Sequence, residues 1–444
     1  MDVRKQIDLT VDVLIVGGGA AGLSAAVAAA RNGLKVTLVE RYGFCGGGAV
    51  AGMSGTVCGL YQAFKPEKPI LEQVVFGFAN EFINALEGRN GIGDPVLYGN
   101  TYTRVHDPLV WRHVSDGFIR HENIQVIYHA MVVGVITSGN GSDEVLGAKV
   151  FTKQGLLDIR AKMTIDASGD AEVVAMAGLP SFIGNEGKVQ NPTMIFRILG
   201  VDVEAFIKKY GDNAIKGQEV ASLIQSKNEQ KQYFLPRSKV FLFPTTRPNE
   251  LLCNCTRILG DDGRELNPLF YQDFTEAELN GREQVTEYAR FLKENLIGCE
   301  QSFVNDTGVQ VGVRQTRQVE GKYKLTNKDV VVGSKFENGI ARSAWPIELH
   351  SGSKPRVEWL YNDFYEIPYE CFIPQRGKNI LVAGRCLSAE HEAVASARVT
   401  AQCFVYGQAI GEAASICIKN NIQPNQLSGS DLRLVLNQKG AQLN

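Results

Sequence analysis

Three glycines near the start of the chain, Gly17, Gly19 and Gly22, have the spacing of a nucleotide-binding turn. Gly17 would allow a strand to turn tightly into a helix, Gly19 would let backbone N–H groups approach a pyrophosphate, and Gly22 would let the helix pack against the strand. The negative pyrophosphate would lie at the positive end of the helix dipole. Glu40 follows Gly22 by 18 residues, close to the offset of about 20 residues at which a carboxylate binds ribose hydroxyls. The pattern predicts a dinucleotide site.

The residues around these glycines have the pattern of strand, helix and strand. Residues 11–16 are apolar and rich in β-branched side chains, as in a strand that is buried on both faces. An alanine-rich helix would follow and end at Gly33, and a second strand would end at Glu40. A signal peptide or a membrane span is not expected, because Asp12 and three consecutive glycines interrupt the apolar run and no basic segment flanks it.

The composition is that of a folded chain with a full hydrophobic core. Hydrophobic residues make up 44% and charged residues 21% of the 444 residues, a length that suits two or three domains. The net charge of −2 gives no electrostatic reason to expect nucleic acid or an anionic membrane as a partner. Nine cysteines without a CxxC pair indicate reduced thiols in a cytoplasmic protein. Cys253 and Cys255 could share a metal, but no second ligand pair lies near them, so we expect no metal site.

The same pattern of buried strand and small-residue helix returns late in the chain, after an irregular middle part. The first part has a glycine-rich loop (43–55), a helix (70–87), a turn-rich segment (88–103), a helix that begins at Asp107 and Pro108, a strand (124–130), a β-meander (131–138, 145–152, 156–163) and a buried strand (163–168). The later elements are two strands (196–202, 238–246), a long amphipathic helix (276–296), a buried strand (379–384) and a helix of small residues (394–419).

These elements predict an α/β fold built from two domains. Residues 1–185 and 366–425 would form a discontinuous Rossmann-like nucleotide-binding domain, with a parallel sheet and a β-meander. Residues 186–365 would form an inserted mixed α+β substrate domain, and residues 426–444 would form a C-terminal tail.

Longer motifs extend this interpretation beyond the glycines. They are DASGD (166–170), NILVAGR (379–385) and three blocks at 311–330, 340–350 and 367–414, which together with the first forty residues span nearly the whole chain. By these motifs the chain resembles the FAD-binding domain of the glutathione-reductase/succinate-dehydrogenase flavoprotein superfamily, and within it a group of FAD-dependent oxidoreductases. FAD is favoured over NAD also because the chain carries one dinucleotide fingerprint, whereas a reductase with its own NAD(P)H domain normally carries two.

The resemblance implies which residues would hold the adenosine and pyrophosphate parts of FAD. The glycine turn, with Ala21, would hold the pyrophosphate. Glu40, with Arg41 beside it, would hold the adenosine ribose. Backbone groups of Met131 and Val132 would contact the adenine.

It also implies the residues on the flavin side. The loop 43–49 would pass under the flavin, residues 167–170 would close the nucleotide side, and Gly384–Arg385 would approach the ribityl chain or the pyrophosphate. Residues 395–397 would open the last helix and direct its N–H groups at the flavin pyrimidine ring. Cys45 could link FAD covalently, or simply fit a crowded turn. The full implied set is Gly17, Gly19, Ala21, Gly22, Glu40, Arg41, Gly47, Gly48, Met131, Val132, Ala167, Gly169, Gly384, Arg385, Ser396 and Ala397.

Four side chains are candidates for the chemistry at the substrate. His391, between the last strand and the last helix, could act as a base while hydride moves to flavin N5, or could only bind backbone. Arg314 and Arg317 could anchor a carboxylate or a flavin oxygen, or form structural salt bridges. His350 could likewise act at the substrate or have only a structural role. The weaker candidates are Arg342 and Arg398.

The expected activity is hydride transfer between a small polar metabolite and flavin N5, in an enzyme without its own NAD(P)H domain. An external electron donor or acceptor, such as oxygen, a quinone or a carrier protein, would complete the cycle. Two alternatives stay open: a non-redox flavoprotein such as a hydratase or isomerase, and a flavin-binding scaffold or sensor. The chain could also form a homo-oligomer.

Overall fold

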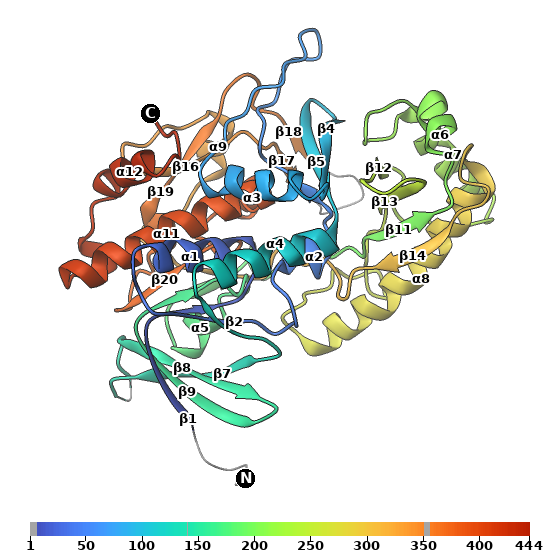
Figure 1. Cartoon of the computed structure of the whole chain (residues 1–444). Helices are drawn as coiled ribbons and strands as arrows, with labels where there is room; N and C mark the ends of the chain where they lie inside the picture. Colours follow the sequence, from blue (N-terminus) through green and yellow to red (C-terminus); the bar gives the residue numbers. More distant parts are fainter. Residues whose placement is uncertain (1–6, 140, 350–355) are drawn as a thin grey trace.

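The computed structural model describes residues 7–139, 141–349 and 356–444, and it is built around one large sheet (Figure 1). The strands of this sheet are β6 (Gln125–Ile127), β2 (Val36–Val39), β1 (Ile7–Val16), β9 (Gly155–Asp166), β8 (Val145–Thr152), β7 (Met131–Thr137) and β20 (Ile380–Val382). The fold is therefore the predicted α/β fold with a parallel sheet and a β-meander.

Strand β9 joins the two parts of this sheet. It pairs in parallel with β1 along one side. On its other side it pairs antiparallel with β8 near its start and in parallel with β20 near its end. The two strands predicted at 156–163 and 163–168 are thus one continuous strand. Asp166 lies opposite both Val16 and Val382, so the carboxyl ends of three parallel strands meet at one edge, where ligands bind in such sheets.

Helices α1 (Ala20–Arg31) and α11 (Thr400–Asn420) pack closely against each other, as Figure 1 shows. Small residues make this approach possible. A Cβ at Gly407 would lie 2.0 Å from the carbonyl oxygen of Ala21, and one at Gly411 would lie 2.5 Å from that of Ala25. Ser24 of α1 also donates to the carbonyl oxygen of Phe404, at 2.6 Å. The two ends of the sequence therefore form one layer.

The C-terminal helix predicted at 394–419 is interrupted, which corrects the sequence prediction. Helix α10 (His391–Ala397) ends at Ala397, and α11 begins at Thr400. The first turn of α11 is bonded to strand β3 (Thr56–Val57) and the residue after it: Thr400 Oγ1 donates to the carbonyl oxygen of Thr56 at 3.3 Å, and the Ala401 N–H donates to that of Cys58 at 3.1 Å. These tertiary bonds accompany a break that no glycine or proline marks in the sequence.

Two further predictions in the first 110 residues need correction. The helix predicted at 70–87 is α3 (Phe78–Glu87), which begins eight residues later, after Gly77 at φ 69°. The turn-rich segment 88–103 contains the hairpin β4 (Ile92–Tyr98) and β5 (Thr101–His106). The next prediction is confirmed: α4 (Pro108–His121) begins after Asp107, whose side chain accepts from the Leu109 N–H at 2.7 Å.

The middle of the chain forms a second, mixed α+β unit with its own core, seen at the right of Figure 1. Its antiparallel sheet consists of β12 (Phe241–Pro244), β13 (Glu250–Asn254), β11 (Phe196–Leu199) and β14 (Phe303–Thr307). Its helices are α6 (Val203–Tyr210), α7 (Gln218–Glu229) and α8 (Tyr271–Asn295). Its core contains residues between 194 and 311, including both Cys253 and Cys255. No group of potential metal ligands occurs among the described residues.

Residues from 319 onward contribute instead to the core of the large sheet. Val319, Ile340 and Tyr365 belong to that core, as do Leu432 and Leu436 near the C-terminus. The elements in this region are β15 (Arg317–Val319), α9 (Asn327–Val331), β16 (Gly339–Ser343), β17 (Ile347–Leu349), β18 (Arg356–Glu358), β19 (Tyr365–Pro368) and α12 (Gly429–Gln438). The remaining short elements are α2 (Gly47–Val50), α5 (Glu172–Met176), β10 (Ser181–Ile183), η1 (Tyr369–Phe372) and η2 (Pro424–Gln426). The domain boundaries drawn from the sequence stay a prediction. Within the described ranges, no helix has both the length and the apolar character needed to cross a membrane.

Candidate functional site

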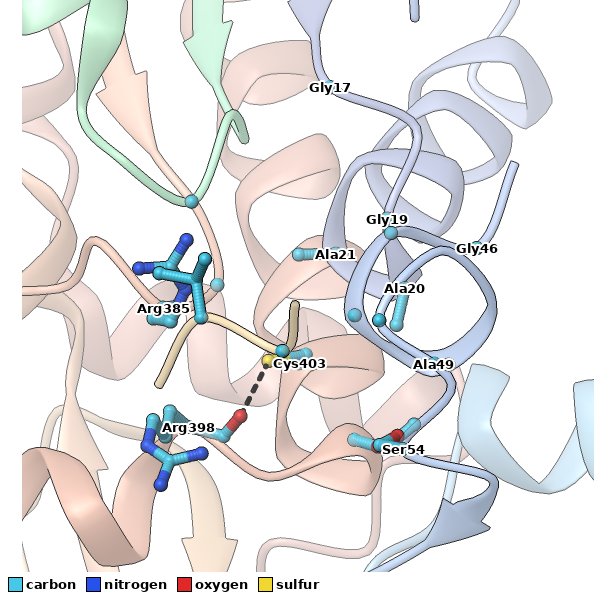
Figure 2. Close-up of a pocket in the computed structure, with 18 of the residues that line it drawn as sticks. Gly17, Gly19, Ala20, Ala21, Gly46, Ala49, Ser54, Arg385, Arg398 and Cys403 are labelled. Carbon is cyan, nitrogen blue, oxygen red and sulfur yellow. Dashed lines mark hydrogen bonds between the residues drawn. The ribbon is translucent and has the colours of Figure 1, made fainter. Parts of the chain in front are cut away.

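A cavity of about 480 Å³ opens at the carboxyl edge of the sheet, between the glycine loops and the middle unit. It is lined by segments from both ends of the chain and from its middle. Gly17 lies at one end of the site drawn in Figure 2, Arg398 and Ser54 lie at the opposite end, and Arg385 lies across from Gly19. Most of the residues predicted to hold FAD line this cavity: Gly17, Gly19, Ala21, Glu40, Arg41, Gly47, Gly48, Met131, Val132, Ala167, Gly169, Gly384 and Arg385.

The glycines of the turn serve two different purposes. A Cβ at Gly17, where φ is 98°, would lie 2.4 Å from the carbonyl oxygen of Ala167, and one at Gly22 would lie 1.8 Å from that of Gly17. These two glycines are required by the packing of the chain itself. In contrast, a Cβ at Gly19 would meet only Gly47 Cα, at 3.9 Å, and one at Gly48 would meet no atom within 4 Å. Both open positions line the cavity and leave space that suits a pyrophosphate.

The electrostatics of the same end favour an anion. Helix α1 begins at the cavity with Gly19 as its N-cap, and in this described turn no side chain caps the free N–H groups and no acidic residue is present. Its partial positive charge is therefore available to a bound group. The short turn 47–50 faces it, and the Gly46 N–H donates to the carbonyl oxygen of Gly18 at 2.9 Å, which holds the two loops together.

Glu40 is buried beside this turn, at 4% exposure, and lines the cavity. Its two carboxylate oxygens accept from the N–H groups of Gly18, at 2.6 Å, and Tyr42, at 2.8 Å. Burial raises the pKa of Glu40, and these backbone bonds oppose that rise. The bonds hold the carboxylate at the cavity wall, where its remaining lone pairs can accept hydrogen bonds from ribose hydroxyls. Arg41 forms an ion pair with Glu172 at 2.8 Å.

Asp170 and Arg385 connect three distant segments on the other wall. Arg385 Nη2 donates to Asp170 Oδ1 at 2.7 Å, and Arg385 Nη1 donates to Thr316 Oγ1 at 2.9 Å. Burial would raise the pKa of Asp170, but the charge of Arg385 and the hydrogen bonds from Thr316 and Arg385 outweigh it and lower that pKa. The ion pair fixes the Arg385 guanidinium at the cavity, next to Gly384.

Three residues of the predicted FAD set lie away from the cavity wall. Gly22 packs α1 against the strand turn. Ser396 and Ala397 lie inside α10 rather than at the start of the last helix: Ser396 Oγ is bonded to Tyr365 OH at 2.7 Å, and the carbonyl oxygen of Ala397 accepts from Tyr406 OH at 2.8 Å. Ala395 of α10 does line the cavity, as do Arg398 and Val399 between the two helices and Thr400, the first residue of α11.

Of the predicted catalytic residues that the structure describes, Arg314, Arg317 and His391, only Arg314 lines the cavity. Arg314 lines the cavity, whereas Arg317 lies outside the lining and donates to the carbonyl oxygen of Asp170 at 3.1 Å. His391 also lies outside the lining; burial lowers its pKa, and its Nδ1 has no hydrogen-bond partner in the described part of the chain. His350 lies outside the described residues. The role of each in catalysis stays a prediction.

Arg398, a weaker candidate from the sequence, lies at the cavity together with Arg314. Consecutive residues bind the two side chains: Arg314 Nη1 donates to the carbonyl oxygen of Asn191 at 2.9 Å, and Arg398 Nη2 donates to Gln190 Oε1 at 3.1 Å. Burial and the positive charges of Arg237 and Arg398 lower the pKa of Arg314 to about 9. Burial and the charge of Arg385 lower the pKa of Arg398 to about 10. Both values leave the guanidinium groups charged at neutral pH.

A buried tyrosine–glutamate pair completes this end of the cavity. Tyr98 OH lies 2.9 Å from each carboxylate oxygen of Glu348, and both residues line the cavity. Burial, and secondly the charge of Glu348, raise the pKa of Tyr98 well above its ordinary value, so the hydroxyl keeps its proton at neutral pH. Neither residue is among the candidates predicted from the sequence, because Tyr98 lies in the segment expected to be turns. The one available signal was that Glu348 belongs to the motif at 340–350.

Burial raises the thiol pKa of the cysteines at and beside the cavity, and a covalent link from Cys45 to FAD stays a prediction. Cys45 is fully buried outside the cavity lining, and burial raises the pKa of its thiol to about 12. A Cβ at Gly18 would lie 2.8 Å from the sulfur of Cys45, so this side chain occupies a crowded turn. Cys403, which Figure 2 shows with its Sγ bonded to the carbonyl oxygen of Arg398, does line the cavity, and burial raises its pKa to about 12.

Known proteins resemble this chain over all or part of its length. A family model described as FAD dependent oxidoreductase matches residues 12–436. A digeranylgeranylglycerophospholipid reductase of Picrophilus torridus is 30% identical over 208 residues, which are 44% of this chain and 48% of that protein. A urocanate reductase of Eggerthella lenta is 25% identical over 168 residues, 36% of this chain and 27% of that protein. The chain thus spans about half or less of these relatives.

A solved structure confirms the fold. The crystal structure of a geranylgeranyl bacteriochlorophyll reductase-like protein of Thermoplasma acidophilum has a TM-score of 0.53 and 16% identity, and the match covers 98% of this chain and 85% of that one. The family match over nearly the whole length, together with the open space at Gly19 and Gly48, agrees with FAD as the cofactor. The chain belongs to the FAD-dependent oxidoreductase family and is an enzyme that uses FAD.

Proposed function

We propose that this enzyme transfers hydride between a small polar metabolite and N5 of bound FAD, with an external electron donor or acceptor as the second substrate. The observation that carries the proposal is the shared cavity. One continuous lining includes the glycine turn at Gly19 and the polar group of Arg314, Arg398 and Tyr98. A metabolite held by that polar group would therefore lie in the same cavity as the cofactor.

The residues that would hold FAD lie in the part of the cavity nearest the sheet. The turn at Gly17–Ala21 and the facing Gly48 would take the pyrophosphate, Glu40 the ribose, and Met131 and Val132 the adenine. When bound, FAD supplies the acceptor or donor of the hydride.

The residues at the far end can orient a substrate and handle its proton. The guanidinium groups of Arg314 and Arg398 offer charge-assisted hydrogen bonds to a polar group. The Tyr98 hydroxyl is hydrogen-bonded to the carboxyl group of Glu348, so the pair can donate or accept a proton at the substrate carbon or oxygen. His391 was the base expected from the sequence; because its ring lies outside the cavity lining, we assign this proton to the Tyr98–Glu348 pair.

The relatives support redox use of the cofactor over a structural one. Two of them are named as reductases, of digeranylgeranylglycerophospholipid and of urocanate. We expect that a true substrate or product, added to the FAD-loaded protein without oxygen, bleaches or restores the visible absorbance band of the flavin. Turnover of a metabolite with no change in that band at any time would show the non-redox alternative, a hydratase or isomerase, to be correct.

A further inference from the structure

We propose that the Arg314–Arg398 end of the cavity is a carboxylate-binding subsite, and that the substrate is a small monocarboxylate with an apolar body. This inference rests on the proposed function, because it assigns the substrate class of the same site. It is carried by the position of the two guanidinium groups, the charge balance around them and the character of the adjacent wall.

The two guanidinium groups are bound by adjacent residues and keep donors to spare. The neighbouring residues Gln190 and Asn191 each accept one hydrogen bond from them, at 3.1 Å from Arg398 and 2.9 Å from Arg314. Both acceptors are neutral amide oxygens, which orient the arginines without neutralising them. Within the described residues, Arg398 Nε is buried and has no hydrogen-bond partner. A forked donor pair of this kind matches the two oxygens of a carboxylate.

The charges at this end of the cavity leave an excess of positive charge. Four carboxylate side chains are among the described lining residues. Three of them belong to the nucleotide end: Glu40 accepts from backbone, Glu172 pairs with Arg41, and Asp170 pairs with Arg385. Glu348 is the fourth, and it faces both Arg314 and Arg398.

A third arginine adds to this excess. Arg237 acts on Arg314 with like charge, and in the described part of the chain its buried Nε and Nη2 have no hydrogen-bond partner. Its Nη1 donates to Asn254 Oδ1, a cavity-lining residue, at 3.1 Å. Among the described residues, the charges that act on Arg314 are those of the cations Arg237 and Arg398 and of the carboxylate of Glu348. One further anion would balance most of this charge at a site where burial strengthens Coulomb attraction.

The wall beside the arginines is aromatic and fits an apolar body. Tyr98, Phe243 and Trp345 all line the cavity, and their rings contact one another at centroid distances of 6.0 Å and 5.1 Å from Tyr98. Burying an apolar surface here releases water from it, whereas a second carboxylate on the ligand would meet these rings instead of a donor. A monocarboxylate therefore fits better than a dicarboxylate.

The test uses the FAD-loaded protein with benzoate as the probe and benzamide as its neutral analogue of the same shape. Binding is followed by calorimetry and by the change in the visible flavin spectrum. We expect benzoate to bind at least about tenfold more tightly than benzamide, because a charged acceptor strengthens each hydrogen bond from a guanidinium. Equal affinities for the two compounds would overturn the inference without any variant being made.

Variants locate the site. Arg314→Met and Arg398→Met keep the length of the side chain and remove its charge, so each should raise the dissociation constant of benzoate by about tenfold or more and leave that of benzamide nearly unchanged. Arg290→Met, on the exposed face of α8, is the matched control and should leave both constants unchanged. FAD content and melting temperature report whether each variant is folded. Benzoate affinity that is insensitive to both cavity variants would place the probe elsewhere and overturn the inference.

The outcomes separate this inference from the proposed function. Arginine-dependent benzoate binding in a protein whose flavin never changes redox state during turnover would refute the proposed function and keep the carboxylate subsite. Bleaching of the flavin by a metabolite, together with benzoate and benzamide binding equally, would keep the proposed function and refute the subsite.

Discussion

At the residue scale, the glycine turn separates positions that the chain needs from positions that a ligand needs. Gly17 and Gly22 leave no room for a Cβ because carbonyl oxygens of the chain lie within 2.4 Å and 1.8 Å of it. Gly19 has such room and nevertheless lacks a side chain. This difference, at a position that lines the cavity, supports the proposal that the cofactor occupies the open space at Gly19.

This difference predicts the effect of Gly19→Val. The variant should fold, because its side chain meets open space in the protein, but we expect it to retain less than about a tenth of the wild-type FAD, since the side chain occupies the pyrophosphate position. FAD content is measured from the flavin absorbance of the purified protein. Gly117→Val, at an exposed helical glycine with no atom within 4 Å of its Cβ position, is the control and should stay yellow. A Gly19→Val protein with one FAD per chain would contradict the assignment.

A second prediction at this scale concerns the proton. Tyr98→Phe removes the hydroxyl bonded to Glu348 and should slow reduction of the flavin by the substrate by about 10²- to 10⁴-fold, the usual loss for an acid or base. His391→Asn should slow it by less than about tenfold, because the ring lies outside the cavity lining. Stopped-flow absorbance measures both rates, with FAD content as the check on folding. If His391→Asn slowed flavin reduction more than Tyr98→Phe did, His391 would be the residue that exchanges the proton with the substrate.

At the element scale, the sequence predicted what local patterns determine and missed what distant contacts impose. The turn at Gly17–Gly22 and the cap at Asp107 were correct because both depend on bonds within a few residues. The break between α10 and α11 was missed because it is accompanied by bonds from Thr400 and Ala401 to Thr56 and Cys58, more than 300 residues earlier. The pairing of Tyr98 with Glu348 joins residues 250 positions apart, and no periodicity reports such a contact.

The junction of β5 and α4 predicts a pH effect on stability. His106 is buried there, its ring 4.6 Å from that of Trp111, and in the described part of the chain neither ring nitrogen has a hydrogen-bond partner. Burial lowers its pKa to about 4, although Asp107 opposes this change. In the unfolded chain the pKa is about 6.5, so the unfolded state takes up the proton first as pH falls. The stabilisation is complete above about pH 6.5 and is lost as pH falls toward about 4.

From about pH 7 to about pH 5, we therefore expect this histidine to lower the free energy of unfolding by about 2 kcal/mol. Urea unfolding at the two pH values measures it, and His106→Phe should remove this part of the pH dependence. His121→Phe, at a side chain that is 81% exposed, is the control and should keep the wild-type slope. An identical slope in wild type and His106→Phe would contradict the prediction.

At the scale of the whole molecule, the cavity depends on segments from the entire chain. Its lining runs from Val16 through Thr193 and Arg314 to Cys403. The two ends of the sequence meet where α1 packs on α11. The middle unit lies at the carboxyl edge of the large sheet, where it lines the cavity. FAD bound in such a place contacts residues that are brought together only by the complete fold.

Cofactor binding should therefore stabilise the folded chain as a whole. With free FAD at about 100 times its dissociation constant, we expect the free energy of unfolding to rise by about 2.7 kcal/mol, because the ligand binds the folded state and not the unfolded one. Thermal unfolding at increasing FAD concentration measures the shift. The Gly19→Val protein should show no shift over the same range, and a wild-type melting temperature that does not respond to FAD would contradict the account.

The most direct test of the central claim is a crystal structure of the protein with FAD and benzoate bound. We predict the FAD pyrophosphate over Gly19 and Gly48, the adenine at Met131 and Val132, and the benzoate carboxylate against Arg314 and Arg398 in the same cavity as the flavin ring. FAD bound in the reverse direction, or a flavin ring that is separated by protein from the two arginines, would contradict the claim that one cavity brings cofactor and substrate together.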